Sequence, residues 1–428
     1  MLFEDYARER VPTDKGVSGW RIGLIFIGVG LALPAFLTGA TVAVGLGFYP
    51  AVVAVFISGI ILSIVGMTTG VIGSRMRLST YWITQFAFGR WGALLINFVF
   101  ALTFFAWFGV SLSMFAQAID QLVTEQFQID LGRSAWSVIG GVMMVATAIW
   151  GFRGLDKLSL ITVPLLAVLL LVTDWRAINL SSLSEIISTP GSGEMTMGVA
   201  ISILVGGWMV GASILPDLSR YARRDADGAL GAFLCFMPGL LLIMAAAMIP
   251  ALALGEMDII KAMVHFGWPV LSGVALTMAA WSTNDNNLYS ASLSIVSAVP
   301  QIAKWQVTVI AGAFGIMLAV LGILDHFIGF LILLGVFVPP IAGIYITDYF
   351  MHRQKYDAHE MGPNGLVGIQ KINVVAMVSW IVASALAFAT SPKDPVGLEL
   401  FQLTSIPALD GLLASAAIYF LLSRSLTK

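Results

Sequence analysis

A polar stretch late in the chain offers the clearest chemistry in the sequence. Residues 279–287 read Ala-Ala-Trp-Ser-Thr-Asn-Asp-Asn-Asn, which puts two hydroxyls, three amides and one carboxylate in or at the end of an apolar run. Burying such groups in hydrocarbon is costly, about 2.5–3.5 kcal/mol for an aspartate at mid-membrane on insertion scales. A chain that keeps them there is expected to use them. The adjacent hydroxyls of Ser282 and Thr283 are hard oxygen donors, which suit a small cation such as sodium.

The composition is that of a membrane protein. Apolar residues make up 58% of the 428 residues and charged residues 11%, and the mean hydropathy of +0.92 excludes a water-soluble domain. The polar segment Met1–Lys15 and the long apolar run after it do not form a cleavable signal peptide. The single cysteine, Cys235, excludes a disulfide framework and a cysteine metal site.

Long apolar runs recur along the whole chain. Each is long enough, at about 20 residues, to cross a bilayer as a helix. We predict twelve such helices, an even number, so both chain ends should lie on one side of the membrane. The expected ranges are 22–47, 50–72, 92–119, 135–152, 158–175, 196–215, 228–253, 268–288, 305–323, 327–350, 371–390 and 404–423.

The distribution of lysine and arginine indicates which side that is. With cytoplasmic chain ends, 18 of the 22 basic residues fall in cytoplasmic segments, and four fall outside: Arg133, Arg176, Lys261 and Lys393. Positive charge concentrates in cytoplasmic loops. The sequence therefore predicts a multi-pass protein of the inner (cell) membrane with both termini in the cytoplasm.

Polar segments divide the predicted helices into groups. Residues 188–193 separate five helices from the next five, the polar stretch 351–363 precedes a final pair, and residues 256–266 should lie along the outer membrane surface. The expected organisation is a cytoplasmic tail (1–20), a first unit of five helices (21–187), a second unit (188–351), a cytoplasmic loop (352–370) and two closing helices (371–428).

Helices at matching positions of the two units carry helix-breaking residues near their midpoints. In the first, Pro34 removes a backbone donor and frees carbonyls one turn earlier. The sixth contains Gly206, Gly207 and Gly211. Proline and glycine also serve kinks and close packing in membrane helices, but a matched pair of interrupted segments indicates the binding site of a secondary transporter.

Five short motifs carry a resemblance to a known family. They are Trp107–Val110, Pro216–Tyr221, Trp281–Asn286, Pro339–Gly343 and Thr347–Phe350, and they follow one another in the same order as in that family. With them the chain resembles the nucleobase:cation symporter-1 family, most closely its cytosine-permease branch. The resemblance implies an all-α integral membrane fold of twelve helices, with a LeuT-like five-plus-five inverted repeat, broken helices 1 and 6 and two further C-terminal helices. It also implies import of a planar nitrogen heterocycle by sodium or proton symport through alternating access.

The resemblance implies a sodium site formed by five oxygen atoms. Carried over to this chain, these are the backbone carbonyls of Gly28, Leu31 and Ala279 and the hydroxyls of Ser282 and Thr283. The alternative for the two hydroxyls is that they bond back to carbonyls of their own helix.

The resemblance also implies a substrate held between the third and sixth helices by aromatic rings. Trp107 and Trp208 match those positions, and Gly207 precedes Trp208 as in the hydantoin-transporting branch. Aromatic pairs gain about 0.5–1.5 kcal/mol beyond the burial of their area. The alternative, packing or interfacial anchoring, conflicts with the position of both tryptophans near mid-span.

Three positions depart from the pattern of cytosine permeases. Phe104, Val210 and Ala279 replace polar residues that meet the base, and each polar group of cytosine left without a partner would cost about 1–3 kcal/mol. The departures favour a bulkier or less polar ring, such as a substituted pyrimidine or a hydantoin. Ser111, one turn after Trp107, is a further candidate contact, and Thr103 a weaker one.

Four charged residues near the inner helix ends have open roles. Asp217 and Arg220 are spaced to pair and could form a gate, but, like Asp348, they are expected to be solvated helix ends. Asp285, directly after the sodium motif, is expected to order the helix or to respond to protons if protons replace sodium.

The sequence fits other classes of function less well than it fits a symporter. An amino-acid carrier of the same architecture needs a group for the substrate carboxylate, and a membrane enzyme needs a nucleophile with a base or paired carboxylates at depth. The predicted spans contain no such catalytic set, so the chain is not expected to be an enzyme. A sensor that binds the heterocycle without transport stays open as an alternative.

The expected partners are this small molecule and the lipid bilayer, with no nucleic acid and no obligate protein partner.

Overall fold

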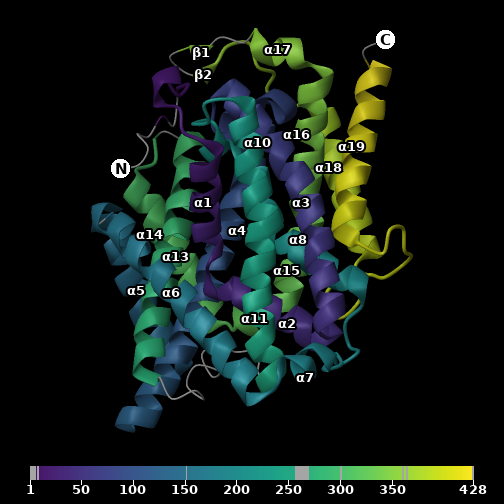
Figure 1. The fold of residues 1–428 in the computed structure, drawn as a ribbon. Coiled ribbons are helices and arrows are strands. Elements are labelled where there is room, and N and C mark those ends of the chain that lie inside the picture. Colours follow the sequence, from purple (N-terminus) through teal and green to yellow (C-terminus); the bar gives the residue numbers. More distant parts are fainter. Residues whose placement is uncertain are drawn as a thin grey trace.

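The fold is a bundle of helices with a small hairpin at one end (Figure 1). The structure, a computed structural model, describes residues 6, 9–150, 152–255, 269–298, 301–358, 361–362 and 365–426. The segment expected along the outer surface, 256–266, lies outside these residues.

The first half of the chain begins with a 3₁₀ turn, Thr13–Lys15, and continues in seven helices. These are α1 (Gly19–Gly30), α2 (Leu33–Leu46), α3 (Phe48–Met76), α4 (Thr80–Phe127), α5 (Gly132–Trp150), α6 (Phe152–Leu180) and the short α7 (Leu183–Ser188). Gly89 interrupts α4 with a φ of 76°, so its first turns make an angle with the rest.

The second half contains longer helices joined by short ones. They are α8 (Met197–Ser213), α9 (Pro216–Ser219), α10 (Asp225–Leu234), a π-helical turn (Cys235–Gly239), α11 (Leu240–Leu254), α13 (Pro269–Ala298), α14 (Lys304–Val320), a 3₁₀ turn (Ile323–His326), α15 (Phe327–Phe337), α16 (Pro339–Met351) and α17 (Arg353–Asp357). Strands β1 (Met361–Gly362) and β2 (Gly365–Leu366) pair in antiparallel orientation, and α18 (Val374–Thr390) and α19 (Pro407–Leu426) follow.

Helices occupy most of each of the twelve ranges predicted from hydropathy, but the ranges 22–47, 228–253 and 327–350 each hold more than one helix. Within the described residues, six helical segments are long and apolar enough to cross a membrane: Phe48–Met76, Thr80–Glu125, Gly132–Ile149, Met197–Ser219, Asp225–Leu254 and Ile323–Met351. The bent pair α1 and α2 makes a seventh, and α14 and α18 are shorter apolar helices. By length and composition these helices could cross a membrane, and the count of twelve crossings stays a prediction.

The interruption of the first predicted helix lies where Pro34 indicates it. α1 and α2 meet at 74°, with Leu31 and Ala32 between them. Pro34 stands in the first turn of α2, a position where its missing N–H leaves no helical bond unmade.

The expected break among the glycines of the sixth predicted helix is wrong. α8 runs without interruption through Gly206, Gly207 and Gly211 and ends at Ser213, and the chain turns at Ile214 and Leu215 before α9. Gly206 has a packing role instead, because a Cβ atom there would lie 2.3 Å from the carbonyl oxygen of Leu331 in α15. Its missing side chain lets two helices approach closely.

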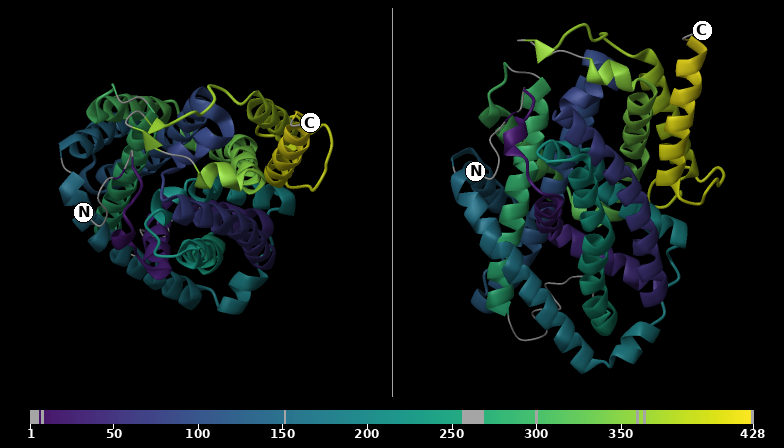
Figure 2. Two further views of the ribbon diagram at one scale, coloured as in Figure 1. Left: turned by 90° about the horizontal axis from the view of Figure 1, so that it is seen from above. Right: turned by 45° about the horizontal axis from the view of Figure 1, so that its top comes forward.

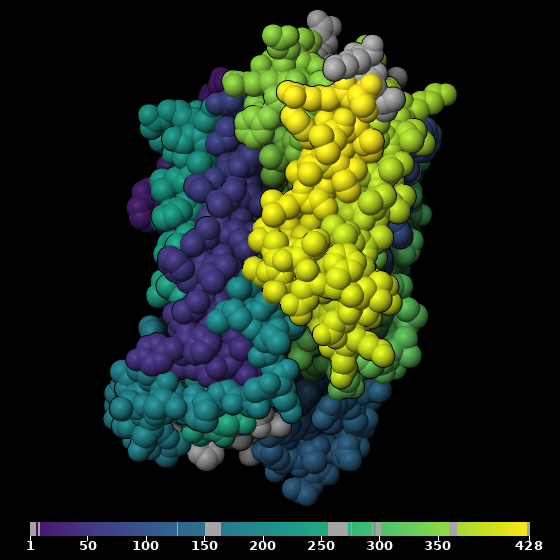
Figure 3. Space-filling model, turned by 90° about the vertical axis from the view of Figure 1, so that its right-hand side faces the viewer, coloured from purple at the N-terminus to yellow at the C-terminus, as the bar shows by residue number. Residues whose placement is uncertain are grey.

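The two last helices pack on the side of the bundle. Figure 2 shows them at its edge, and Figure 3 shows α19 as part of an outer layer beside α3. α19 contacts α16 and α18 extensively.

A buried polar cluster joins these helices at the end of the molecule that carries α17 and the hairpin. The Asp348 carboxylate accepts hydrogen bonds from the hydroxyls of Tyr419, at 2.6 Å, and Tyr356, and lies 2.9 Å from Nδ1 of His352. Asn373, at the start of α18, donates to the hydroxyl of Tyr419 at 3.2 Å. The expectation that Asp348 is a solvated helix end is wrong, because its side chain is only 2% exposed.

Candidate functional site

The break between α1 and α2 leaves backbone carbonyls without their helical donors. The N–H of Ala32, the regular donor to Gly28, donates to Gly30 at 2.9 Å. The N–H of Ala35, the regular donor to Leu31, donates to Ala32 at 2.9 Å. The break therefore frees the two carbonyls that the resemblance assigned to a cation, and such backbone is tolerated at membrane depth where it lines a cavity.

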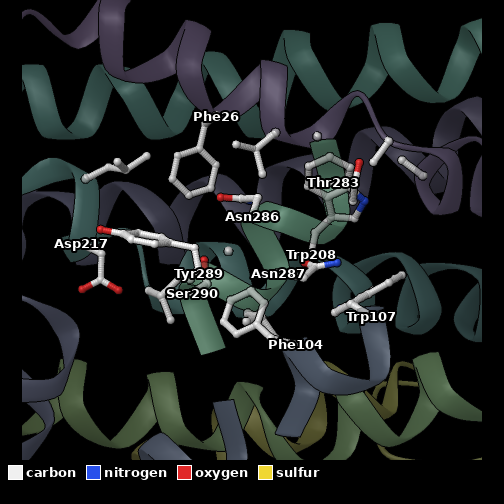
Figure 4. Close-up of a pocket in the computed structure, with 18 of the residues that line it drawn as sticks. Phe26, Phe104, Trp107, Trp208, Asp217, Thr283, Asn286, Asn287, Tyr289 and Ser290 are labelled. Carbon is white, nitrogen blue, oxygen red and sulfur yellow. The ribbon is translucent and has the colours of Figure 1, made fainter. Parts of the chain in front are cut away.

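A cavity of about 340 Å³ lies beside this break (Figure 4). Four elements form most of its wall: the region around the break, α4, α8 and α13. The lining includes Phe26, Gly30, Ala32, Pro34 and Thr38; Phe104, Trp107 and Ser111; Gly207, Trp208, Val210 and Gly211; and Thr283, Asn286, Asn287, Tyr289, Ser290 and Ser294. It also reaches Asp217, Arg220 and Tyr221, toward the end of the bundle that carries the N-terminal segment.

The two tryptophans of the cavity are held by different partners. A Cβ atom on Gly30 would lie 2.5 Å from the ring of Trp208, so this indole packs directly on the backbone at the end of α1. Trp107 meets Phe330 edge to face, with ring centroids 5.1 Å apart. Gly207, directly before Trp208, also lines the cavity, and a Cβ atom there would lie 3.9 Å from the ring of Trp107. Both rings are therefore fixed in place while still bordering the cavity.

Ser111 is a polar group of the cavity wall without an internal partner. Its residue is 1% exposed, and its hydroxyl makes no hydrogen bond to any described residue. A buried hydroxyl normally has a partner, and leaving it without one costs about 1–3 kcal/mol. A bound molecule in the cavity could supply that partner.

Ser282 and Thr283 differ from the neighbouring hydroxyl residues of α13. Thr277 and Ser292 donate to carbonyls four residues earlier, at 2.7 and 2.6 Å. Over the described chain neither Ser282 nor Thr283 donates such a bond. Their hydroxyl oxygens are therefore available to a ligand.

Most of the predicted substrate residues border one cavity. Trp107, Trp208, Gly207, Phe104, Ser111 and Val210 all line it, whereas Ala279 is 1% exposed and does not. Of the predicted cation ligands, Thr283 lines the cavity. The cavity lining does not include Gly28, Leu31 or Ser282. It does include residues close to them in the sequence, namely Gly30, Ala32 and Thr283.

The polar side of the cavity extends beyond the predicted residues. Asn286, Asn287, Ser290 and Ser294 follow Thr283 along one face of α13, at spacings of three, four, seven and eleven residues. None of the four was assigned a role from sequence. Continuing the helical spacing from Thr283 would have found them.

The charged residues near the site occupy different surroundings from those expected. Asp217 accepts a hydrogen bond from the N–H of Thr80 at 2.7 Å, and Arg220 donates to the backbone carbonyls of Asp217 and Tyr6. Arg220 is 3% exposed, so the expectation of a solvated helix end is wrong for it. Asp285 is 4% exposed, and neither carboxylate oxygen has a partner among the described residues.

Known proteins match most of this chain. The family described as "Permease for cytosine/purines, uracil, thiamine, allantoin" matches residues 12–404. The cytosine permease of Escherichia coli (strain K12) is 28% identical over 384 residues, which cover 89% of this chain and 88% of that protein. The hydantoin permease of Microbacterium maritypicum is 25% identical over 429 residues, which cover 92% and 86%.

Solved structures share the fold. The inward-facing conformation of Mhp1 aligns with a TM-score of 0.84 at 20% identity, over 99% of this chain and 94% of that one. A Na+-coupled sialic acid symporter in a substrate-bound outward-open state aligns with a TM-score of 0.69 at 15% identity, over 98% and 92%. With a family match over most of its length and this fold, the chain belongs to the permease family for cytosine, purines, uracil, thiamine and allantoin, and it is a membrane transporter rather than an enzyme.

Proposed function

We propose that this protein imports a planar nitrogen heterocycle, of pyrimidine or hydantoin type, by sodium symport through alternating access. The observation that carries the proposal is a single cavity bordered by two fixed indoles, the unpartnered Ser111 hydroxyl, the α1–α2 break and Thr283. Flat rings suit the space between indoles. The relatives whose names state cytosine and hydantoin support the substrate class.

Sodium as the coupling ion is part of this proposal. The five oxygen atoms are the carbonyls of Gly28, Leu31 and Ala279 and the hydroxyls of Ser282 and Thr283. The freed carbonyls and the free hydroxyls described above support this set, and the name of one fold neighbour, a Na+-coupled symporter, agrees with it. Sodium would join the break to α13 and so complete the wall on which the ring rests.

The proposal includes the architecture of the chain in the membrane. We infer twelve crossings in units 21–187, 188–351 and 371–428, the first two forming an inverted repeat. The excess of basic residues on one side supports cytoplasmic termini, the tail 1–20 and the loop 352–370, in the inner membrane. The cavity, which reaches Arg220 and Ser294, would then open toward the cytoplasm.

The first experiment measures linkage between sodium and substrate. Purified protein is titrated with pyrimidines, purines, hydantoins and thiamine precursors, with and without sodium, and its melting temperature is recorded. Thr283→Ala should weaken sodium binding. Since linked sites share one coupling free energy, it should also lower the affinity for the heterocycle in the presence of sodium, by a factor of roughly 5–150. Without sodium the variant should bind the ring as the wild type does.

Thr277→Ala is the matched control, because its hydroxyl lies on the same helix and bonds back to Gly273. It should keep the sodium dependence. If Thr283→Ala keeps it as well, the cation site is misassigned. Counterflow of the same radiolabelled heterocycle into proteoliposomes distinguishes a carrier from a sensor, which would bind the ring without exchange.

A further inference from the structure

A second hollow lies on the outer side of the bundle, between α4 and α13. It is a groove of about 370 Å³, lined by Trp91, Leu94, Leu95 and Phe98 from α4 and by Ser294 and Ile295 from α13, with Asn97 at its base. Trp91, Leu95 and Phe98 are 56%, 43% and 51% exposed. In a membrane transporter these side chains face the bilayer.

One residue separates this groove from the central cavity. Ser294 lines both hollows, whereas the other groove residues do not border the cavity. The wall between the bilayer and the transport pathway is therefore one side chain thick at this point. Whatever fills the groove also covers the cavity from the side.

The hydrogen-bond donors of Ser294 and Asn97 in the groove have partners within the protein. The hydroxyl of Ser294 donates to the carbonyl of Ser290 at 2.9 Å. The amide of Asn97 donates to the hydroxyl of Thr84 at 3.1 Å and to the carbonyl of Ala93 at 2.7 Å. Because these donors need no further partner, the groove suits an apolar occupant rather than a polar one.

Positive charge gathers at one end of the groove. Arg90 precedes Trp91, and the N–H of Trp91 donates to the carbonyl of Lys371 at 2.8 Å, so Arg90 and Lys371 both lie beside the groove end. Both residues are exposed, and neither forms an ion pair with any described residue. The bordering segments 88–98, 290–298 and 368–375 contain no acidic residue.

We propose that this groove binds one acyl chain of an anionic phospholipid of the bilayer. The headgroup phosphate lies at Arg90 and Lys371, next to the exposed indole of Trp91, which is typical of the membrane interface. The chain runs along α4 from Trp91 to Phe98, about 10 Å at the rise of a helix, and covers Ser294. The lipid thereby closes the thin wall of the cavity.

The test counts lipids on the intact protein. Full-length protein is delipidated in detergent, titrated with phosphatidylglycerol or phosphatidylcholine, and examined by native mass spectrometry. We expect one phosphatidylglycerol to bind at least tenfold more tightly than phosphatidylcholine. The double variant Arg90→Gln with Lys371→Gln should lose that preference, and Leu95→Trp, which fills the groove, should lose the bound lipid.

Two controls separate the groove from general lipid contact. Arg424→Gln removes an exposed cation from α19, and Leu242→Trp enlarges a residue of α11 that is 71% exposed; both should bind lipid as the wild type does. Equal binding of the two lipids to the wild type overturns the proposal. So does unchanged phosphatidylglycerol binding in the double variant, whose two exposed side chains can change without disturbing the fold. The outcome does not depend on transport.

Discussion

Ser111 and its neighbour Ser113 show how position on one helix turn separates a binding group from a structural one. The hydroxyl of Ser111 lines the cavity and has no described partner, whereas that of Ser113 donates to the carbonyl of Gly109 at 2.9 Å. Both residues are buried. Of the two, only Ser111 therefore has its hydroxyl donor left for a ligand.

Ser111→Ala should weaken binding of the heterocycle without loosening the empty protein. A hydrogen bond to a ligand is worth about 1 kcal/mol net, roughly a fivefold change in the dissociation constant. Removing an unpartnered buried hydroxyl should leave the melting temperature of the empty protein equal or higher. Calorimetric titration and thermal unfolding measure the two effects.

Ser113→Ala serves as the control and should show the reverse pattern, with lower stability and unchanged affinity. Equal affinities for the wild type and Ser111→Ala would mean that the ligand does not contact this hydroxyl.

At the scale of elements, the adjacent glycines Gly206 and Gly207 of α8 have different structural roles. A Cβ atom on Gly206 would meet the carbonyl oxygen of Leu331 at 2.3 Å and the nitrogen of Gly335 at 2.7 Å, both backbone atoms of α15. A Cβ atom on Gly207 would first meet a side-chain methyl of Leu331, at 3.3 Å. Gly206 therefore sets the distance between two helices, and Gly207 shapes the cavity.

Gly206→Ala should destabilise the protein, because α8 and α15 must separate; overpacking of this kind costs about 1–3 kcal/mol. Gly207→Ala should fold with little loss of stability but reduce the affinity for the heterocycle, since its methyl group narrows the space beside Trp107. Melting temperatures and ligand titrations of both variants test this. Similar stability of the two variants would contradict the close approach of the helices.

At the scale of the whole molecule, the Asp348 cluster connects segments from distant parts of the sequence. Tyr356 stacks on Phe86 of α4 with ring centroids 4.3 Å apart, and Asn373 donates to the carbonyl of Ala87 at 2.7 Å. The cluster thereby ties α4, α16, α18 and α19 together at one end of the bundle. His352 is its partly exposed member.

The stability of this end should depend on pH through His352. The hydrogen bond to Asp348 is the main cause that raises the pKa of His352 above its usual 6.5, although burial opposes it. A raised pKa means that the folded state holds the proton more tightly, so the stabilisation is complete below pH 6.5 and is lost as pH rises through the raised value. The melting temperature should therefore fall over that range.

His352→Gln should remove this part of the pH dependence. The melting temperature of the variant should fall furthest below that of the wild type at acidic pH. His326→Gln, at an exposed histidine in the turn before α15, should leave the profile unchanged. Parallel profiles for the wild type and His352→Gln would show that the pair does not couple to folding.

Sequence reasoning succeeded where a local cause decides the structure. Hydropathy located the helices, and Pro34 fixed the first break because a missing N–H acts within one turn. The break expected at Gly206 was wrong, since the effect of a glycine depends on what packs against it, here Leu331. Asp348 was misjudged for a similar reason: its partner Tyr419 lies 71 residues away in the sequence. The pairing of Trp107 with Trp208 in one wall came from the family resemblance, not from local pattern.

The hydroxyl of Tyr419 also bears on how this protein could be shortened for biophysical work. A shortened chain that ends before residue 352 would keep the ten predicted helices of the two repeat units. It would lack His352, Tyr356 and Tyr419, so the buried Asp348 would have none of these partners. Leaving a buried polar group without its hydrogen-bond partners costs about 1–3 kcal/mol, a sizeable share of the stability of most domains. Shortened forms of this transporter should therefore keep the chain through α19.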